Sequence, residues 1–189
     1  MKIETIAIHA GNTVNSLTGE VIQPISLSTT FERDLEGNYP DGYMYTRSDN
    51  PNRRSLEKVL AALEHGADAC AFSSGNAAGS AVFQALDPGS HVIAPDDMYH
   101  GLRNALLQVF KGVLSVDFVD TTSLDAIEKA IKPTTRLIWL ESPSNPLLKI
   151  SDIAAICSLA KKHTIKVACD NTFATPIFQC PLALGADIV

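Results

Sequence analysis

The sequence predicts an α/β fold, in which a mainly parallel sheet carries helices on both faces and follows an extended N-terminal arm. Three observations lead to this prediction. From residue 51 onward short apolar segments alternate with amphipathic helical stripes, whereas the first 50 residues show little helical period. The chain of 189 residues is 46% hydrophobic and 19% charged, a balance typical of a folded globular protein. We therefore expect an arm at residues 1–50 and an α/β domain at residues 51–189.

The arm is predicted from its turn-forming residues. Glycine and proline recur through it, at Gly11, Gly19, Pro24, Gly37, Pro40 and Gly42. Both residue types interrupt regular structure, so an extended, turn-rich segment is expected.

The first half of the α/β domain begins with a helix at residues 54–65, which Gly66 should end as its C-cap. An apolar strand is predicted at residues 69–72, followed by a helix at 76–86 that Asp87-Pro88-Gly89 stops. The next strand is predicted at residues 91–94.

The alternation continues to the end of the chain. Helices are predicted at residues 102–110, 123–131 and 151–163, and strands at 114–119, 137–141 and 165–169. Residues 185–189 look like the start of another buried strand, and the sequence stops inside it. We therefore expect the chain to be a portion of a longer polypeptide.

Composition argues against several classes of protein. A net charge of −6 disfavours a nucleic-acid surface, which needs a basic stripe. There is no apolar run of membrane-spanning length and no signal-peptide core, so a membrane partner is not expected. The four cysteines are far apart and form no CxxC pair, which disfavours a metal site and is typical of thiols in the cytoplasm.

The most informative residue is Asp170, at the end of the apolar strand 165–169. Open α/β sheets bind ligands at the carboxyl ends of their strands. A carboxylate withdrawn from water there requires a cationic partner, and the protonated ring nitrogen of a cofactor would serve.

Small residues lie between a predicted strand and helix at Ser74, Gly75 and Asn76. Exposed amides of a first helical turn bind anions, so a phosphate would fit there. The alternative is a simple N-cap, since the spacing is neither that of dinucleotide folds nor the Walker pattern.

Two further residues follow strands at the same expected edge. Tyr99 could stack on a flat ring or simply pack at a helix start. Asn145, between Pro143 and Pro146, could position a ligand or belong to a structural turn.

In the arm, Tyr45 and Arg47 place a phenol beside a guanidinium, a group suited to phosphate or carboxylate. Such groups would be explained by a contribution to the site of a neighbouring subunit. An exposed arm with incidental charge is the alternative.

Taken in order, these segments resemble one family. The set comprises Tyr45-x-Arg47 with Asn50-Pro51, Ser74-Gly75, Asp97-x-Tyr99, Glu141-Ser-Pro-Ser-Asn145-Pro146 and Asp170-Asn-Thr-Phe-Ala-Thr-Pro176. It resembles the Cys/Met-metabolism (trans-sulfuration) family of pyridoxal-phosphate enzymes, which includes cystathionine γ-synthase, cystathionine γ-lyase, methionine γ-lyase and homoserine-ester sulfhydrylases. The resemblance runs from about His9 to Asp187 and implies the fold-type I large domain.

The resemblance also implies roles. Asp170 and Tyr99 would be catalytic, pairing with the pyridinium nitrogen of pyridoxal 5'-phosphate and stacking on its ring. Ser74, Gly75 and Asn76 would bind the phosphate, and Tyr45 and Arg47 would reach it from the partner subunit. Asn145 would lie near the phenolic oxygen of the ring, and Thr172 on the face opposite Tyr99.

The sequence departs from the family in several places. Asn76 replaces the usual Met, and His100-Gly101-Leu102 replaces two glycines and a small hydroxyl residue. Gly101 stands where methionine γ-lyases have a cysteine, which weighs against that member. None of the lysines present fits the position of the Schiff-base lysine, and the substrate-carboxylate arginine is also missing.

The resemblance is closest to cystathionine γ-synthase, with cystathionine γ-lyase or a homoserine-ester sulfhydrylase as alternatives. It implies γ-replacement or γ-elimination on a small amino-acid substrate, and a cytoplasmic homo-oligomer, a tetramer built from dimers that share active sites. A truncated, non-catalytic module that binds a ligand or partner is the non-enzyme alternative. An unrelated nucleotide-binding domain is disfavoured by the missing glycine patterns.

Overall fold

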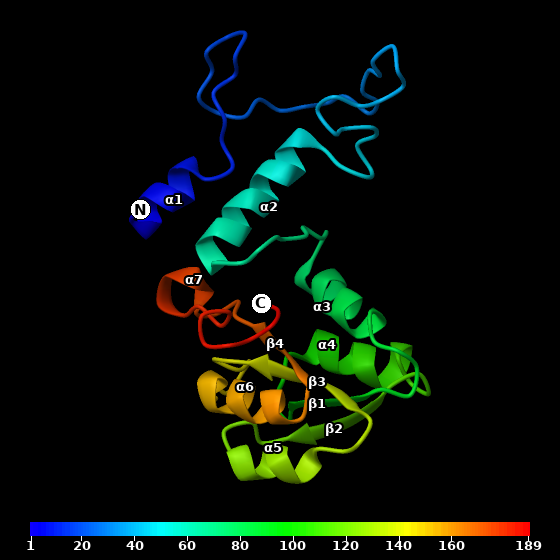
Figure 1. The fold of residues 1–189 in the computed structure, drawn as a ribbon. Helices are drawn as coiled ribbons and strands as arrows, with labels where there is room; N and C mark the ends of the chain where they lie inside the picture. Colours follow the sequence, from blue (N-terminus) through cyan, green and yellow to red (C-terminus); the bar gives the residue numbers. More distant parts are fainter. The chain divides into compact units, whose positions relative to one another are not determined.

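The computed structural model describes residues 1–189, which divide into two compact units, 1–71 and 72–189. The first unit contains helices α1 (Ile3–His9) and α2 (Pro51–Glu64), joined by a long irregular segment (Figure 1). The second unit contains every strand of the parallel sheet and helices α3 to α7. The sequence predicts that residues 1–50 form an arm that contributes to a neighbouring subunit, and this division of the chain stays a prediction.

Helix α2 begins where the sequence predicts a cap. The side chain of Asn50 accepts a hydrogen bond from the Asn52 amide at 2.9 Å, and Pro51 occupies the first turn, where its missing N–H costs nothing. The helix ends at His65, which has a left-handed φ of 58°, so the prediction that Gly66 forms the cap is wrong.

Helix α1 corrects the prediction that residues 1–50 are extended throughout. It packs on α2, and the chain just after it approaches α2 closely at Gly11, where a Cβ atom would lie 2.3 Å from the carbonyl oxygen of Ser55. The Ser55 hydroxyl in turn donates to the Gly11 carbonyl at 2.9 Å. The helix is thus accompanied by a tertiary contact that local periodicity does not reveal.

The sheet of the second unit has four strands in the order β2-β1-β3-β4, all parallel. Their bounds are β1 (His91–Pro95), β2 (Ser115–Val119), β3 (Thr135–Glu141) and β4 (Lys166–Asp170). These strands confirm the predicted α/β class. Residues 69–72 are not a strand, because they have no ladder partner, and the Ala71 amide instead donates to Glu57 Oε1 at 2.8 Å.

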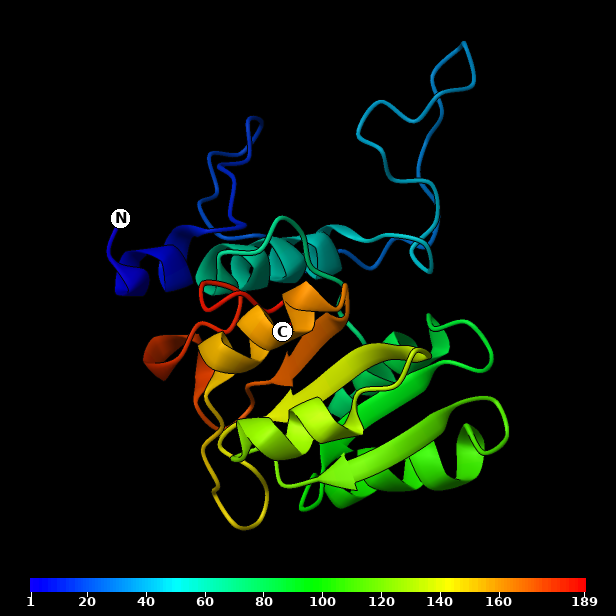
Figure 2. The same ribbon diagram turned by 60° about the horizontal axis from the view of Figure 1, so that its bottom comes forward.

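Helices cover both faces of this sheet (Figures 1 and 2). They are α3 (Gly75–Gln84), α4 (His100–Asn104), α5 (Leu124–Ala130) and α6 (Ile153–Lys162); the short α7 (Thr175–Phe178) follows β4 and buries no residue. Helix α4 continues into a π-helical turn, η1 (Ala105–Val109), where the sequence predicts a single α-helix.

Alternate residues of the strands supply two cores. Ile138 and Leu140 of β3 pack with α5 and α6, whereas Leu137 and Trp139 pack with α3 and α4. Both faces are buried, which explains why the strands read as continuous apolar runs. Beside β4, Ile188 forms a parallel bridge to Ala168, in line with the predicted strand start at residues 185–189. None of the helices has the length and apolar character needed to cross a membrane.

Candidate functional site

The carboxyl edge of the sheet carries a hollow of about 290 Å³. Because β1, β3 and β4 are parallel, the loops that follow them meet at this edge, beside the N-terminus of α3. The lining comprises Ser74, Gly75, Asn76, Tyr99, Leu102, Glu141, Pro143, Asn145, Asp170, Thr172 and Phe173. Seven of the nine residues that the sequence nominates for cofactor binding therefore line one hollow. Their individual roles stay predictions.

Asp170 ends β4 and lies opposite Glu141 of β3 in the strand register. Its Oδ1 atom accepts hydrogen bonds from the Thr172 amide at 3.0 Å and from the Thr172 hydroxyl at 2.5 Å. Its Oδ2 atom accepts no hydrogen bond from residues 1–189. One carboxylate oxygen is thus oriented by the protein, and the other remains available to a donor in the hollow.

The loop after Asp170 is fixed by hydrogen bonds of two side-chain amides, those of Asn171 and Gln179. Gln179 Nε2 donates to Asn171 Oδ1 at 2.8 Å and to the Ser142 carbonyl at 2.7 Å, and Asn171 Nδ2 donates to the Gln179 carbonyl at 2.9 Å. These bonds join the loop after β4 to the turn after β3, so the two walls of the hollow are connected.

The N-terminus of α3 presents amides to the same hollow. Ser74 is the N-cap, and its hydroxyl oxygen accepts from the Ala77 amide at 3.1 Å. The amides of Gly75 and Asn76 have no acceptor within residues 1–189. A Cβ atom on Gly75 would meet nothing within 4 Å, so the space before these amides is open. Such a pair of amides is suited to a phosphate group.

Glu141 is the site residue to which sequence reasoning assigned no role. Its side chain is only 4% exposed, yet Oε2 accepts from the Tyr99 amide at 2.8 Å and Oε1 from the Asn145 amide at 2.6 Å. One carboxyl group therefore positions two loops. The sequence signal that could have identified Glu141 is its position at the end of a buried strand. The same signal identified Asp170.

The pKa of Glu141 is raised above its ordinary value of 4.5, chiefly because burial penalises the charged form. The two amide hydrogen bonds favour the carboxylate and reduce the shift, and the nearby charges of Asp170 and Asp97 add to it. The hollow is thus a region where negative charge is costly and a positive ligand group would be stabilising.

Tyr99 precedes α4, and its backbone is held by Glu141 while its side chain is 41% exposed. The neighbouring turn, residues 141–149, is tied to the loop after β1. The Ser144 hydroxyl donates to Asp97 Oδ2 at 2.5 Å, and Lys149 Nζ bonds Asp96 Oδ1 at 2.9 Å. No lysine lines the hollow.

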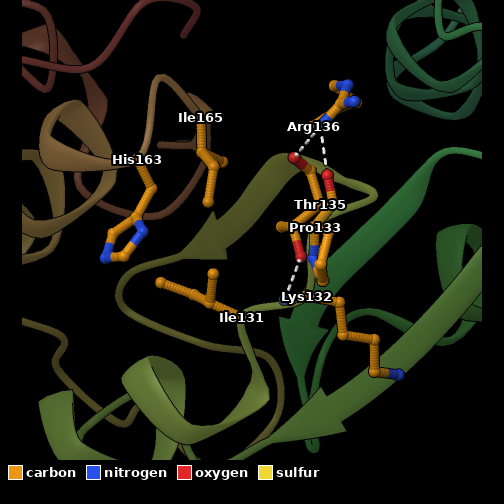
Figure 3. Close-up of a pocket in the computed structure, with 7 residues that line it drawn as sticks. All are labelled: Ile131, Lys132, Pro133, Thr135, Arg136, His163 and Ile165. Atoms are coloured by element: carbon orange, nitrogen blue, oxygen red, sulfur yellow. Dashed lines mark hydrogen bonds between the residues drawn. The ribbon is translucent and has the colours of Figure 1, made fainter.

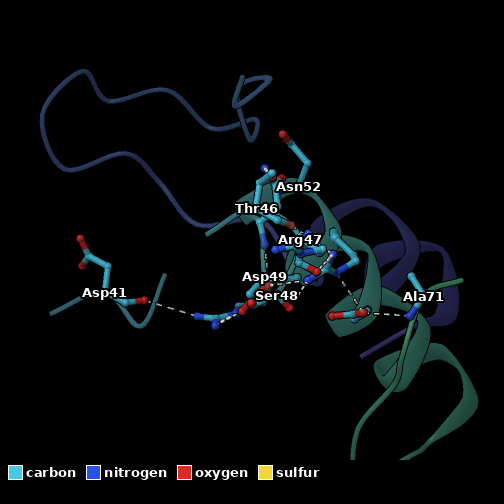
Figure 4. Close-up of polar contacts among 11 residues, drawn as sticks. Asp41, Thr46, Arg47, Ser48, Asp49, Asn52 and Ala71 are labelled. Carbon is cyan, nitrogen blue, oxygen red and sulfur yellow. Dashed lines mark hydrogen bonds and ion pairs between the residues drawn. The ribbon is translucent and has the colours of Figure 1, made fainter. Parts of the chain in front are cut away.

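Tyr45 and Arg47 belong to the first unit. Figure 4 shows Arg47 among the polar contacts of that unit. Two other arginines hold their turn: Arg53 donates to the Thr46 and Arg47 carbonyls at 3.4 and 3.5 Å, and Arg54 pairs with Asp49. The Arg47 guanidinium lies 5.2 Å from the centre of the Tyr45 ring and forms no ion pair with any carboxylate of residues 1–189.

A second hollow, of about 350 Å³, lies at the amino edge of the sheet (Figure 3). Its basic side chains do not converge, because Lys132 and Arg136 point away from each other in Figure 3. Lys132 Nζ pairs with Asp117 Oδ2 at 2.6 Å, and Arg136 Nη1 donates to the carbonyls of Pro133 and Thr135, both at 2.9 Å. Both basic side chains already have partners within the chain, so this hollow offers no set of free binding groups like that at the carboxyl edge.

Beside this hollow lies a buried histidine. His91 Nδ1 is 2.8 Å from the Thr135 hydroxyl, and Nε2 lies 3.3 Å from Asp117 Oδ2 without forming a hydrogen bond. The pKa of His91 is lowered, first by burial and then by the charge of Lys132. A neutral imidazole in this place is part of the packing.

The fold and the hollow define an α/β protein that binds a planar, phosphorylated ligand at the carboxyl edge of a parallel sheet. The free Asp170 oxygen, the exposed Tyr99 ring and the unpaired amides of α3 fit pyridoxal phosphate, which has a basic ring nitrogen, a flat ring and a phosphate.

Comparison with known proteins identifies the family. The family model described as "Cys/Met metabolism PLP-dependent enzyme" matches residues 4–189, and the chain belongs to this family of enzymes, which depend on pyridoxal phosphate. The resemblance seen in the sequence motifs is thereby confirmed.

Individual relatives agree with this assignment. Cystathionine γ-synthase of Mycobacterium leprae is 48% identical over 99% of this chain and 49% of the relative's length. Cystathionine γ-lyase of Bacillus subtilis is 44% identical over 100% of this chain and 50% of the relative. A crystal structure of cystathionine γ-lyase from Lactobacillus plantarum, complexed with L-serine, superposes with a TM-score of 0.94 at 43% identity, covering 100% of this chain and 49% of that one. The chain thus spans about half the length of these relatives.

Proposed function

We propose that the protein containing this chain catalyses pyridoxal-phosphate-dependent γ-replacement on an activated homoserine ester, as a cystathionine γ-synthase, in methionine and cysteine metabolism. Cystathionine γ-lyase and homoserine-ester sulfhydrylase activities are the alternatives within the family. The relatives support the synthase and the lyase, since a cystathionine γ-synthase and a cystathionine γ-lyase match nearly the whole chain at 48% and 44% identity. The observation that carries the proposal is the Asp170 carboxylate, which faces the hollow with one oxygen free.

The bound cofactor supplies a ring that accepts electron density from a carbanion at the substrate's α carbon. Asp170 would hold a proton on the ring nitrogen, because its Oδ2 atom is free while Thr172 keeps Oδ1 oriented. The buried Glu141 has a structural role, because both of its carboxylate oxygens already accept hydrogen bonds from backbone amides. Asp170 would therefore determine how strongly the ring stabilises the negative charge that it accepts.

The other lining residues orient the ring. The amides of Gly75 and Asn76, with the Ser74 hydroxyl, bind the phosphate at the N-terminus of α3. Tyr99 and Thr172 both line the hollow, where Tyr99 would stack on the ring and Thr172 would contact its other side. Asn145 would donate to the phenolic oxygen, and its backbone amide is anchored by Glu141 Oε1 at 2.6 Å.

The arm completes the site of a second copy. Tyr45 and Arg47 bind the cofactor phosphate of the neighbouring subunit, and residues 1–50 act as the contributing arm of a cytoplasmic homotetramer built from dimers. The absence of any carboxylate partner for Arg47 supports this role, because an uncompensated guanidinium is suited to an incoming anion.

The activity is tested with the purified protein and added pyridoxal phosphate. A yellow absorption band, together with cystathionine formation from an activated homoserine ester and cysteine, is expected. Cleavage of cystathionine without its formation would assign the lyase instead. A protein that binds the cofactor but turns over neither substrate would be a non-catalytic module, which contradicts the proposal.

The shared site is tested by complementation. Arg47→Ala and Asp170→Ala place their defects in different units of the chain, so mixed oligomers of the two variants contain some sites with neither defect. Partial recovery of activity on mixing is expected. If no mixture exceeds the activity of the two variants measured separately, the arm does not act in a neighbouring site.

A further inference from the structure

The residue beside the phosphate amides, Asn76, is in close contact with the start of α4. A Cβ atom on Gly101 would lie 2.6 Å from Asn76 Oδ1 and 2.7 Å from Nδ2. The carboxamide of Asn76 therefore rests on the backbone of Gly101. Any larger residue at position 101 would displace it.

The ring of Tyr99 meets the same point. The Cβ position of Gly101 also lies 2.6 Å from Tyr99 Cε1, so the carboxamide and the edge of the ring converge on one glycine. All three residues lie at the hollow or directly beside it.

Few other contacts restrain this ring. Glu141 holds only the backbone amide of Tyr99, and the phenolic hydroxyl forms no hydrogen bond within residues 1–189. The ring makes no aromatic or cation–π contact of its own. Because it is 41% exposed, its orientation depends on whatever lies along its edge.

The Asn76 carboxamide is not held in place by hydrogen bonds, since neither of its polar atoms has a partner within residues 1–189. Its contribution in this structure is its shape. A flat group of this size occupies space beside Gly101 next to the edge of the ring, which a smaller side chain would leave open.

We propose that Asn76 is a positioning residue which, seated on Gly101, sets the orientation of the Tyr99 ring for stacking on the cofactor. This inference rests on the proposed stacking role of Tyr99. It assigns a function to the Asn76 side chain, beyond the phosphate contact proposed for its backbone amide.

The test uses the purified protein saturated with pyridoxal phosphate, and its readout is the visible circular dichroism of the bound cofactor, which depends on the ring's asymmetric surroundings. Asn76→Ala is expected to lower this signal by about half or more and to weaken cofactor binding by about two- to tenfold, the range of an aromatic stacking contact. Asn76→Leu, of similar size but apolar, is expected to retain both. Gly101→Ala is expected to resemble Asn76→Ala.

Three comparisons make the outcome decisive. His100→Ala, at an exposed neighbour bonded only to Asn104, is the control and should change neither the dichroism nor the affinity. Unchanged dichroism and affinity in Asn76→Ala would overturn the inference. So would an affinity loss seen with pyridoxal phosphate but not with pyridoxal, because the carboxamide would then act on the phosphate. If the wild-type protein itself gives no dichroism with bound cofactor, the stacking role of Tyr99 fails instead.

Discussion

The two edges of the sheet differ in how their polar groups are satisfied. At the amino edge, Lys132 pairs with Asp117, His91 Nδ1 is in hydrogen-bond contact with Thr135, and the unpartnered His91 Nε2 atom does not line the hollow. At the carboxyl edge, Asp170 Oδ2 and two amides of α3 have no partner within residues 1–189. Both edges are hollowed, to about 350 and 290 Å³ respectively. Unsatisfied groups that converge on one space therefore distinguish the functional edge better than cavity size does.

The largest effect is expected at Glu141. Glu141→Ala leaves the amides of Tyr99 and Asn145 without their acceptor, which should lower the free energy of unfolding by about 3 kcal/mol. Chemical denaturation measures this loss. Glu141→Gln keeps one acceptor and should lose less, so equal losses in the two variants would contradict the role given to both oxygens.

The same pair of proteins tests the pKa of Glu141. Since this pKa is raised in the native state, the folded protein binds the proton more tightly than the unfolded chain does. The stabilisation is complete below the ordinary pKa of 4.5 and is lost as the pH rises through the folded value. The free energy of unfolding of Glu141→Gln should lack this decline.

The next largest effect is expected at Asp170. Asp170→Ala removes a charged hydrogen-bond partner of the cofactor, worth about 2 kcal/mol, so the dissociation constant for pyridoxal phosphate should rise about thirtyfold. Equilibrium dialysis measures it. Asp170→Asn tests the charge at nearly constant shape. Stability should change little in either variant, and an unfolded variant would show that Asp170 is structural.

A smaller effect is expected at His91, on the other edge. His91→Asn loses the contact with Thr135 and should be destabilised by about 1 kcal/mol without changing cofactor affinity. The pKa of His91 is lowered by burial, so the unfolded chain binds the proton more tightly and wild-type stability falls as the pH drops below 6.5. Denaturation curves at about pH 7.5 and about pH 5.5 should show a smaller drop in the variant.

The smallest effect is expected at Asp117. The ion pair with Lys132 lowers the pKa of Asp117, but the two side chains are 39% and 47% exposed. Asp117→Asn should therefore cost less than about 1 kcal/mol, and only at a pH above the folded pKa of Asp117. Its cofactor affinity should equal that of the wild type. A large loss of affinity would erase the distinction between the two edges.

Sequence reasoning succeeded where the relevant information is local. The strand ending at Asp170 has a continuous apolar run, and the sheet rule places its last residue at the ligand edge. It was wrong where a partner decides the structure. Helix α1 packs against α2, and residues 69–72 lack a neighbouring strand in this chain.

Glu141 shows the corresponding limit for the site. Its neighbours in sequence predict a turn, and that turn is present. Its function arises from two hydrogen bonds to loops that follow different strands, and only one of those loops is its own. No periodicity or local motif encodes such a bond, so this residue emerged only from the folded chain.

The arginines at the start of α2 have a consequence for the entropy of binding. Arg53 and Arg54 hold the turn of residues 46–49 through its own carbonyls and through Asp49, so the turn is braced by contacts within the chain. A segment that is already ordered has little conformational freedom left to lose when an anion approaches Arg47. The affinity of that guanidinium should therefore depend mainly on charge and distance rather than on the folding of the loop around it.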